Sequence, residues 1–68
     1  MLNLLFVALF SLTNVQTGEV IDDAAMMQVD SITQYAETFN TYRGQVVATD
    51  TDGNDYVVSD AHIVVIEQ

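Results

Sequence analysis

Cysteine, lysine and proline are absent from this chain of 68 residues, and histidine occurs once, as His62. Without cysteine no disulfide can form, and one histidine does not furnish the ligand set of a structural zinc site. A chain of this length removes only about 60% of its unfolded surface from water, so its core usually needs a supplement. Association with other chains is the supplement that remains.

The chain has almost no positive charge. Ten acidic residues stand against Arg43 alone, and the formal net charge is −9. Nucleic-acid binding requires lysine and arginine to neutralise phosphates, so direct binding of nucleic acid is excluded, and anionic membrane surfaces are disfavoured. Such a charge favours a basic protein surface as partner, although acidic residues also serve simply to keep a small protein soluble.

Residues 1–15 are apolar except for four polar positions, and they differ sharply from the rest of the chain. A transmembrane helix needs about 20 apolar residues, so the segment is too short to span a membrane. A secretory signal peptide is an alternative that would leave a mature start near Gly18, but no basic residue precedes Arg43. The favoured interpretation is a helix or strand buried against other subunits.

Residues 16–29 are predicted to form a connector. Gly18 is its flexible point, and Asp22 and Asp23 are suited to cap the element that follows. Residues 24–29 fit either the start of a helix or a short strand. Within them, Met26 and Met27 are interpreted as adaptable core-filling side chains.

Residues 30–44 predict an amphipathic helix. Ser31 and Gln34 have the spacing of a capping box, Arg43 suits the negative end of the helix dipole, and Gly44 suits a left-handed C-terminal cap. Its apolar face recurs at helical spacing through Ile32, Tyr35, Ala36, Phe39 and Tyr42. The aromatic members fit packing on a sheet or, alternatively, an interface stripe.

Residues 45–68 predict antiparallel strands over 45–51, 55–60 and 62–68, with a hairpin turn at 52–54. The run 63–66 is apolar on both faces, which indicates a central or doubly covered strand. The fold class that follows is α+β in one small domain. It comprises one amphipathic helix packed on a three-stranded antiparallel sheet, preceded by an apolar helix or strand.

No group of residues supports catalysis. The acidic stretch 50–55 suggests a calcium loop, but Asp55 stands where that loop needs glycine, so a solvated turn is preferred. Ser59, Asp60 and His62 are too close in sequence to form a relay on one strand, and adjacent aspartates such as Asp22 and Asp23 point apart. We therefore expect no enzyme, no catalytic residue, no metal and no cofactor.

Three short stretches have a similar order in a known family: Asp30, Ser31 and Ile32 before the predicted helix, then Ser59, Asp60 and Ala61, then Val65, Ile66 and Glu67. In this respect the chain resembles the small phage uracil-DNA glycosylase inhibitors. The resemblance implies an acidic protein that mimics DNA and occupies the basic groove of a DNA-binding enzyme.

The expectation placed first is a non-enzymatic structural subunit of a larger assembly, such as an accessory or cement protein of a phage particle. It would bind protein partners through the apolar segment 1–15 and the acidic surface, as an oligomer in the virion or host cytoplasm. An acidic inhibitor that mimics DNA and an exported protein with a cleaved leader are the alternatives.

Overall fold

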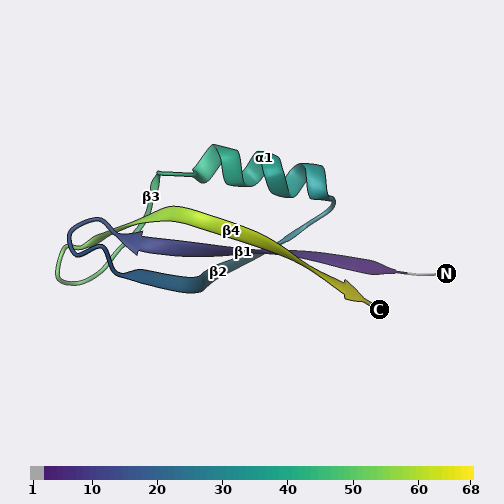
Figure 1. The fold of residues 1–68 in the computed structure, drawn as a ribbon, viewed down its shortest axis with the longest axis horizontal. Helices are drawn as coiled ribbons and strands as arrows, with labels where there is room; N and C mark the ends of the chain where they lie inside the picture. The colour runs from purple at the N-terminus through teal and green to yellow at the C-terminus, as the bar shows by residue number, and fades with distance from the viewer. Residues whose placement is uncertain (1–2) are drawn as a thin grey trace.

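The apolar N-terminal segment forms one of the two central strands of a four-stranded antiparallel sheet (Figure 1). The computed structural model describes residues 3–68, so Met1 and Leu2 of the predicted apolar segment lie outside the described residues. The elements are β1 (Leu4–Asn14), β2 (Val20–Val29), α1 (Ile32–Tyr42), β3 (Val46–Thr49) and β4 (Asp55–Glu67). The strand order is β2-β1-β4-β3, which confirms an α+β fold with one helix but adds a strand to the three predicted.

The additional pairing comes from β2, which lies in the region predicted to be a connector. It runs antiparallel to β1 from Phe6 opposite Val29 to Thr13 opposite Val20. Its sequence hides this role, because aspartate is disfavoured in strands. The ladder is interrupted by a bulge where Asp23 takes a positive φ of 53° and its N–H donates to Ser11 Oγ at 3.3 Å. Asp22 and Asp23 thus lie within a strand and cap no helix.

The two strands predicted over 55–60 and 62–68 are one continuous strand, β4, paired with β1 along nearly its whole length. A bulge near Ser59 shifts the register between them, which allows β4 to curve without ending. The short strand β3 pairs only with the first residues of β4. The turn between them is a loop of residues 50–54, longer than a two-residue hairpin turn, with Gly53 at φ 84°.

The helix α1 starts and ends as its sequence predicts. The Ser31 hydroxyl accepts the N–H of Gln34 at 3.1 Å, and the Gln34 side chain accepts the N–H of Asp30. At the other end Gly44 has the predicted left-handed φ, 79°, but its N–H donates to the Val58 carbonyl of β4 and not to a helix carbonyl. Arg43 is the C-terminal cap residue, and its guanidinium lies 5.9 Å from the centre of the Phe39 ring.

The core lies between α1 and one face of the sheet. Its buried apolar residues are Ala8, Phe10, Leu12, Val29 and Val58. Tyr35 and Phe39 of α1 pack against them, as do Phe6 and Ile63 of the sheet. Two other members of the predicted apolar helix face, Ile32 and Ala36, are exposed, so α1 contributes little more than its two aromatic rings.

The two central strands are longer than the helix that covers them. Figure 1 shows β1 and β4 extending together past the end of α1, so that the start of β1 and the end of β4 project from the body of the molecule. The molecule measures 49 × 19 × 16 Å along its principal axes. Such an elongated shape leaves much of the apolar sheet without a covering layer.

Candidate interaction surface

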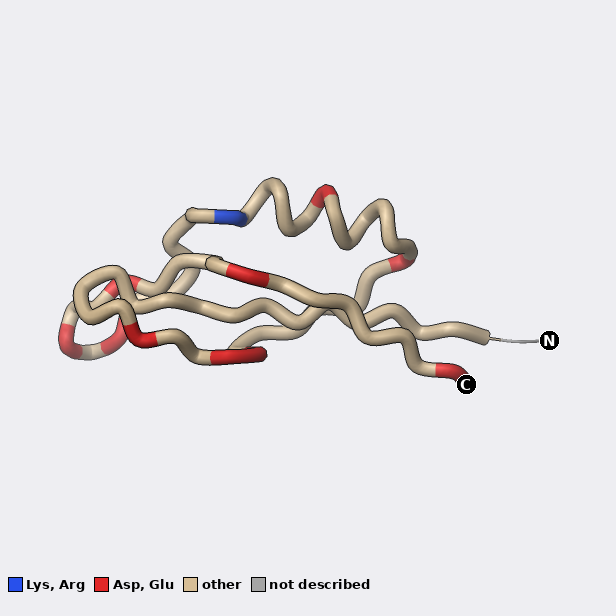
Figure 2. The backbone as a smooth tube through the Cα atoms, viewed as in Figure 1, with Lys and Arg blue, Asp and Glu red and all other residues tan. Residues whose placement is uncertain are grey.

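Acidic residues occupy most of the periphery of the fold. Eight of the ten are exposed, and the other two are half-buried: Asp50 in the loop between β3 and β4, and Asp55 at the start of β4. Figure 2 shows acidic positions grouped in the loops at the end opposite the chain termini and at intervals along the strands, with the one basic position at the end of α1. Since Arg43 is the only lysine or arginine, the negative charge is not neutralised within the chain.

The acidic loop is held together by Asp50. Its carboxylate accepts the N–H groups of Asp52 and Asn54, both at 2.9 Å, and the hydroxyl of Tyr56 at 3.1 Å. These hydrogen bonds hold the pKa of Asp50 below its ordinary value, and the bond from the Asn54 backbone has the largest effect. The same hydroxyl contact raises the pKa of Tyr56. The Asp50 carboxylate therefore stabilises the turn through hydrogen bonds within and next to the loop.

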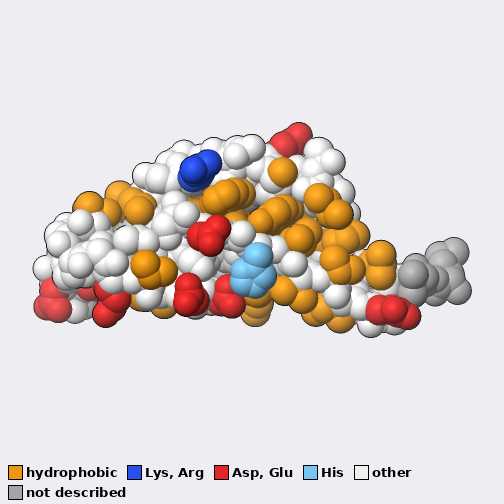
Figure 3. Space-filling view, viewed as in Figure 1, with side chains coloured by type: hydrophobic (Ala, Val, Ile, Leu, Met, Phe, Trp, Pro, Cys, Tyr) orange, Lys and Arg blue, Asp and Glu red, His pale blue; other side chains and the backbone are white. Residues whose placement is uncertain are grey.

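The sheet face opposite α1 carries an apolar surface with no layer over it among residues 3–68. Alternation along β1 and its registered partners places six side chains there: Leu5, Val7 and Leu9 of β1, Met26 of β2, and Val64 and Ile66 of β4. We call this set the open face. Met26 is 75% exposed and Ile66 43% exposed. Figure 3 shows apolar side chains gathered between His62 and the chain ends, with most acidic side chains around the margin.

The outer edge of β4 adds hydrogen-bonding groups to this surface. The N–H of Gln68 donates to the carbonyl of Asn3, and the register continues as Leu5 opposite Ile66 and Val7 opposite Val64. The backbone N–H and C=O groups of successive residues point to opposite sides of an antiparallel strand. From His62 onward, those of the even-numbered residues therefore bond to β1. The N–H and C=O groups of Ile63, Val65 and Glu67 point away from it.

Among the described residues, no strand pairs with this edge beyond Val58. The N–H of Val58 donates to the carbonyl of Gln45, and its carbonyl accepts from Gly44, but β3 extends no further along β4. The N–H of Ala61 is satisfied by the neighbouring carboxylate of Asp60 at 2.8 Å. The run 63–66 was predicted to be a central or doubly covered strand. β4 is a central strand in the sheet order, but the run is not covered on both faces, because Val64, Val65 and Ile66 are exposed.

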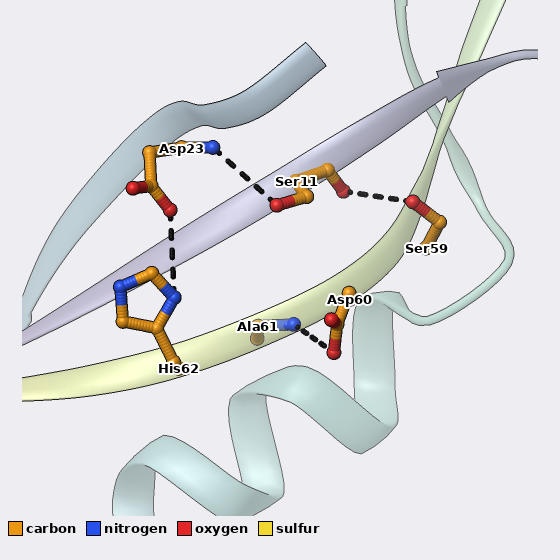
Figure 4. Close-up of polar contacts among 6 residues, drawn as sticks. All are labelled: Ser11, Asp23, Ser59, Asp60, Ala61 and His62. Carbon is orange, nitrogen blue, oxygen red and sulfur yellow. Dashed lines mark hydrogen bonds and ion pairs between the residues drawn. The ribbon is translucent and has the colours of Figure 1, made fainter. Parts of the chain in front are cut away.

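The residues considered for a relay do not meet (Figure 4). The Ser59 hydroxyl donates to the Ser11 carbonyl at 3.3 Å, and the Asp60 carboxylate faces the backbone of Ala61. His62 Nδ1 of β4 lies 3.4 Å from Oδ1 of Asp23, which belongs to β2 on the other side of β1. Both side chains are about half exposed, so the pair is a surface contact at the margin of the open face.

The prediction that Met26 and Met27 fill the core is wrong, because Met26 is 75% exposed and Met27 is 38% exposed. Met27, which lies opposite Ala8 on the α1 side of the sheet, lines a cavity of about 220 Å³ between β2, β3 and the end of α1. Its other lining residues include Phe10, Val58 and Tyr42, and the lining is almost wholly apolar. Tyr42, predicted to belong to the packed helix face, is 46% exposed at the mouth of this cavity.

Comparison with protein-family models, with curated proteins and with solved structures found no match. Within residues 3–68, no helix is long and apolar enough to cross a membrane, and no group of three or more potential ligand side chains is gathered in a way that could hold a metal ion.

Sequence reasoning located part of this surface. The apolar segment 1–15 was predicted to pack against other chains and the run 63–66 to be covered. The structure pairs the two as β1 and β4. The unpaired edge was missed, because it depends on how far β3 extends. The only available signal was the shortness of the β-prone run 46–49 beside the much longer one that follows the loop.

Proposed function

We propose that this chain is a non-catalytic structural subunit that works by packing its sheet against other protein chains in a larger assembly. The observation that carries the proposal is the open face together with the unpaired edge of β4. In a monomer both would remain in water. That the assembly is a virus particle, as expected from the sequence, remains a prediction.

The energetics support association. A fully buried valine, leucine or isoleucine contributes about 1.5–3 kcal/mol relative to an exposed one. The open face has six apolar side chains that are half-buried or exposed. Covering them would gain several kcal/mol, which is comparable with the stability expected for a domain of this length. The core of five buried apolar residues is small, so association would stabilise the fold as well as the assembly.

The test is light scattering combined with intact mass on the chain expressed alone. We expect assemblies of the intact chain, or a chain that becomes soluble only with its partners. Replacement of Ile66 by threonine keeps strand propensity but places a hydroxyl on the open face. Ile32→Thr, at a position 60% exposed on the helix, is the matched control.

Ile66→Thr should reduce the assembled fraction, and Ile32→Thr should leave it unchanged. A soluble monomer of the intact chain at every concentration would overturn the proposal. A mass that lacks the first seventeen residues would instead support the exported alternative.

A second candidate, an acidic inhibitor that mimics DNA, is favoured by the unneutralised charge of −9 on the periphery of the fold. It requires a basic enzyme groove as partner, and added salt would weaken that complex because salt screens attraction between opposite charges. Self-association of this chain has the opposite dependence, since each copy carries the same negative charge. Binding measured at low and high salt therefore separates the two candidates.

A further inference from the structure

The outer edge of β4 is a template for another strand. Beyond Val58 it presents the outward N–H and C=O groups of Ile63, Val65 and Glu67, which no strand among residues 3–68 occupies. Exposed edges of this kind are normally blunted by charge, proline or a covering element, because they readily pair with another strand. Here the residues along the edge are apolar over 63–66, and the chain has no proline.

We propose that the occupant of this edge is a second copy of the chain, whose β4 pairs antiparallel with the first about a two-fold axis at Val64. The inference rests on the proposed function and names the first contact of that assembly. An isologous contact of this kind is the commonest route by which identical chains associate. It would join two four-stranded sheets into one sheet of eight strands, with the two open faces continuous.

The sequence of β4 is complementary to itself in this register. Ile63 of one copy lies opposite Val65 of the other, and these pairs exchange the outward hydrogen bonds. Val64 faces its own counterpart. His62 lies opposite Ile66, Ala61 opposite Glu67, and Asp60 opposite Gln68, so no acid lies directly opposite another acid. Cross-strand pairs of β-branched residues stabilise a sheet, whereas opposed like charges destabilise it.

Neighbouring registers fit less well. Moving the axis to Ile63 places Asp60 opposite Ile66, and moving it to Val65 shortens the paired segment and sets Ile63 against Glu67. α1 contacts both β2 and β4, so it crosses the sheet and does not lie along β4 alone. The two chains together carry a net charge of −18, so added salt should strengthen the dimer.

The register is tested by cysteine cross-linking, since the chain has no cysteine of its own. Val64 points its backbone toward β1, so the two copies of Val64 form a non-hydrogen-bonded pair, with Cα atoms about 4.5 Å apart. That distance is within the range of a disulfide. Under mild oxidation Val64→Cys should become a disulfide-linked dimer. Ile32→Cys, more exposed but on the helix, should remain a monomer on a non-reducing gel.

Proline tests the hydrogen bonds. Val65→Pro removes an N–H that points outward, so the pairing with β1 keeps all its bonds, whereas the proposed dimer loses one bond from each copy. We expect dissociation about 10-fold easier or more by sedimentation equilibrium. Val65→Ala, which keeps the N–H, is the control and should dissociate much less readily than the proline variant. Circular dichroism verifies that both variants fold.

The outcomes separate this inference from the proposed function. If the wild-type chain assembles but Val64→Cys forms no more disulfide than Ile32→Cys, the β4 contact is refuted and the assembly uses another surface. Equal dissociation of folded Val65→Pro and Val65→Ala would refute it as well. A wild-type chain that stays at 7.5 kDa at all concentrations would overturn both proposals.

Discussion

Replacement of Phe10 by alanine should strongly destabilise the isolated chain. Phe10 lies in a central strand, is 7% exposed and contributes the largest side chain among the five buried apolar residues. Truncation of a buried phenylalanine costs about 3–5 kcal/mol through lost burial and the cavity left behind. A domain of 68 residues is expected to have about 3–10 kcal/mol of total stability, so the loss removes a third of it or more.

The assay is urea unfolding followed by circular dichroism at low protein concentration, where association contributes least. With a slope of about 1 kcal/mol per molar urea, the midpoint should fall by about 3 M or more, or the variant should be unfolded without urea. Met26→Ala is the control, because Met26 is 75% exposed, and its unfolding free energy should change by less than about 0.5 kcal/mol. A loss below about 1 kcal/mol for Phe10→Ala would refute the assignment of the core to the space between α1 and the sheet.

Three further predictions concern the loop, the helix cap and the N-terminal strand. Because the pKa of Asp50 is lowered in the folded chain, its contribution to stability is present at neutral pH and lost as the pH falls below about 4. Tyr56→Phe removes one hydrogen bond to the Asp50 carboxylate and should raise that pKa in an NMR titration. Gly44→Ala should cost about 1–2 kcal/mol in urea unfolding, since its φ is 79° while nothing within 4 Å would meet the added Cβ. Deletion of residues 1–17 removes β1 and three of the five buried apolar residues, so circular dichroism should show an unfolded chain.

Local signals predicted the helix well. The capping box at Ser31 and the positive φ at Gly44 depend on neighbours within four residues, so the sequence alone contains the information. The hairpin between β3 and β4 was likewise marked by its turn residues, although its loop is longer than the dipeptide rule suggests.

Long-range pairing was harder to predict. β2 carries two aspartates and two methionines where strand formers are expected, and it is a strand because β1 offers it a ladder of hydrogen bonds. The bulge at Ser59 made β4 look like two strands, since the register shift interrupts the alternation on which such predictions rest.

The sequence predicts that an apolar surface remains exposed, but not where in the fold that surface lies. Composition showed that the chain has more apolar residues than so short a fold can bury. Which of them stay exposed depends on where α1 lies and how short β3 is, because together these leave the open face uncovered and the edge of β4 unpaired beyond Val58.

The most direct measurement is amide hydrogen exchange on the wild-type chain at concentrations below and above that at which it assembles. The N–H groups of Ile63 and Val65, on the outer edge of β4, should exchange quickly in the monomer and become protected on assembly. Those of Met26 and Gln28, which point outward from β2 by the same alternation, should stay unprotected. Assembly that leaves Ile63 and Val65 exchanging as fast as in the monomer, or no assembly at any concentration, would contradict the account.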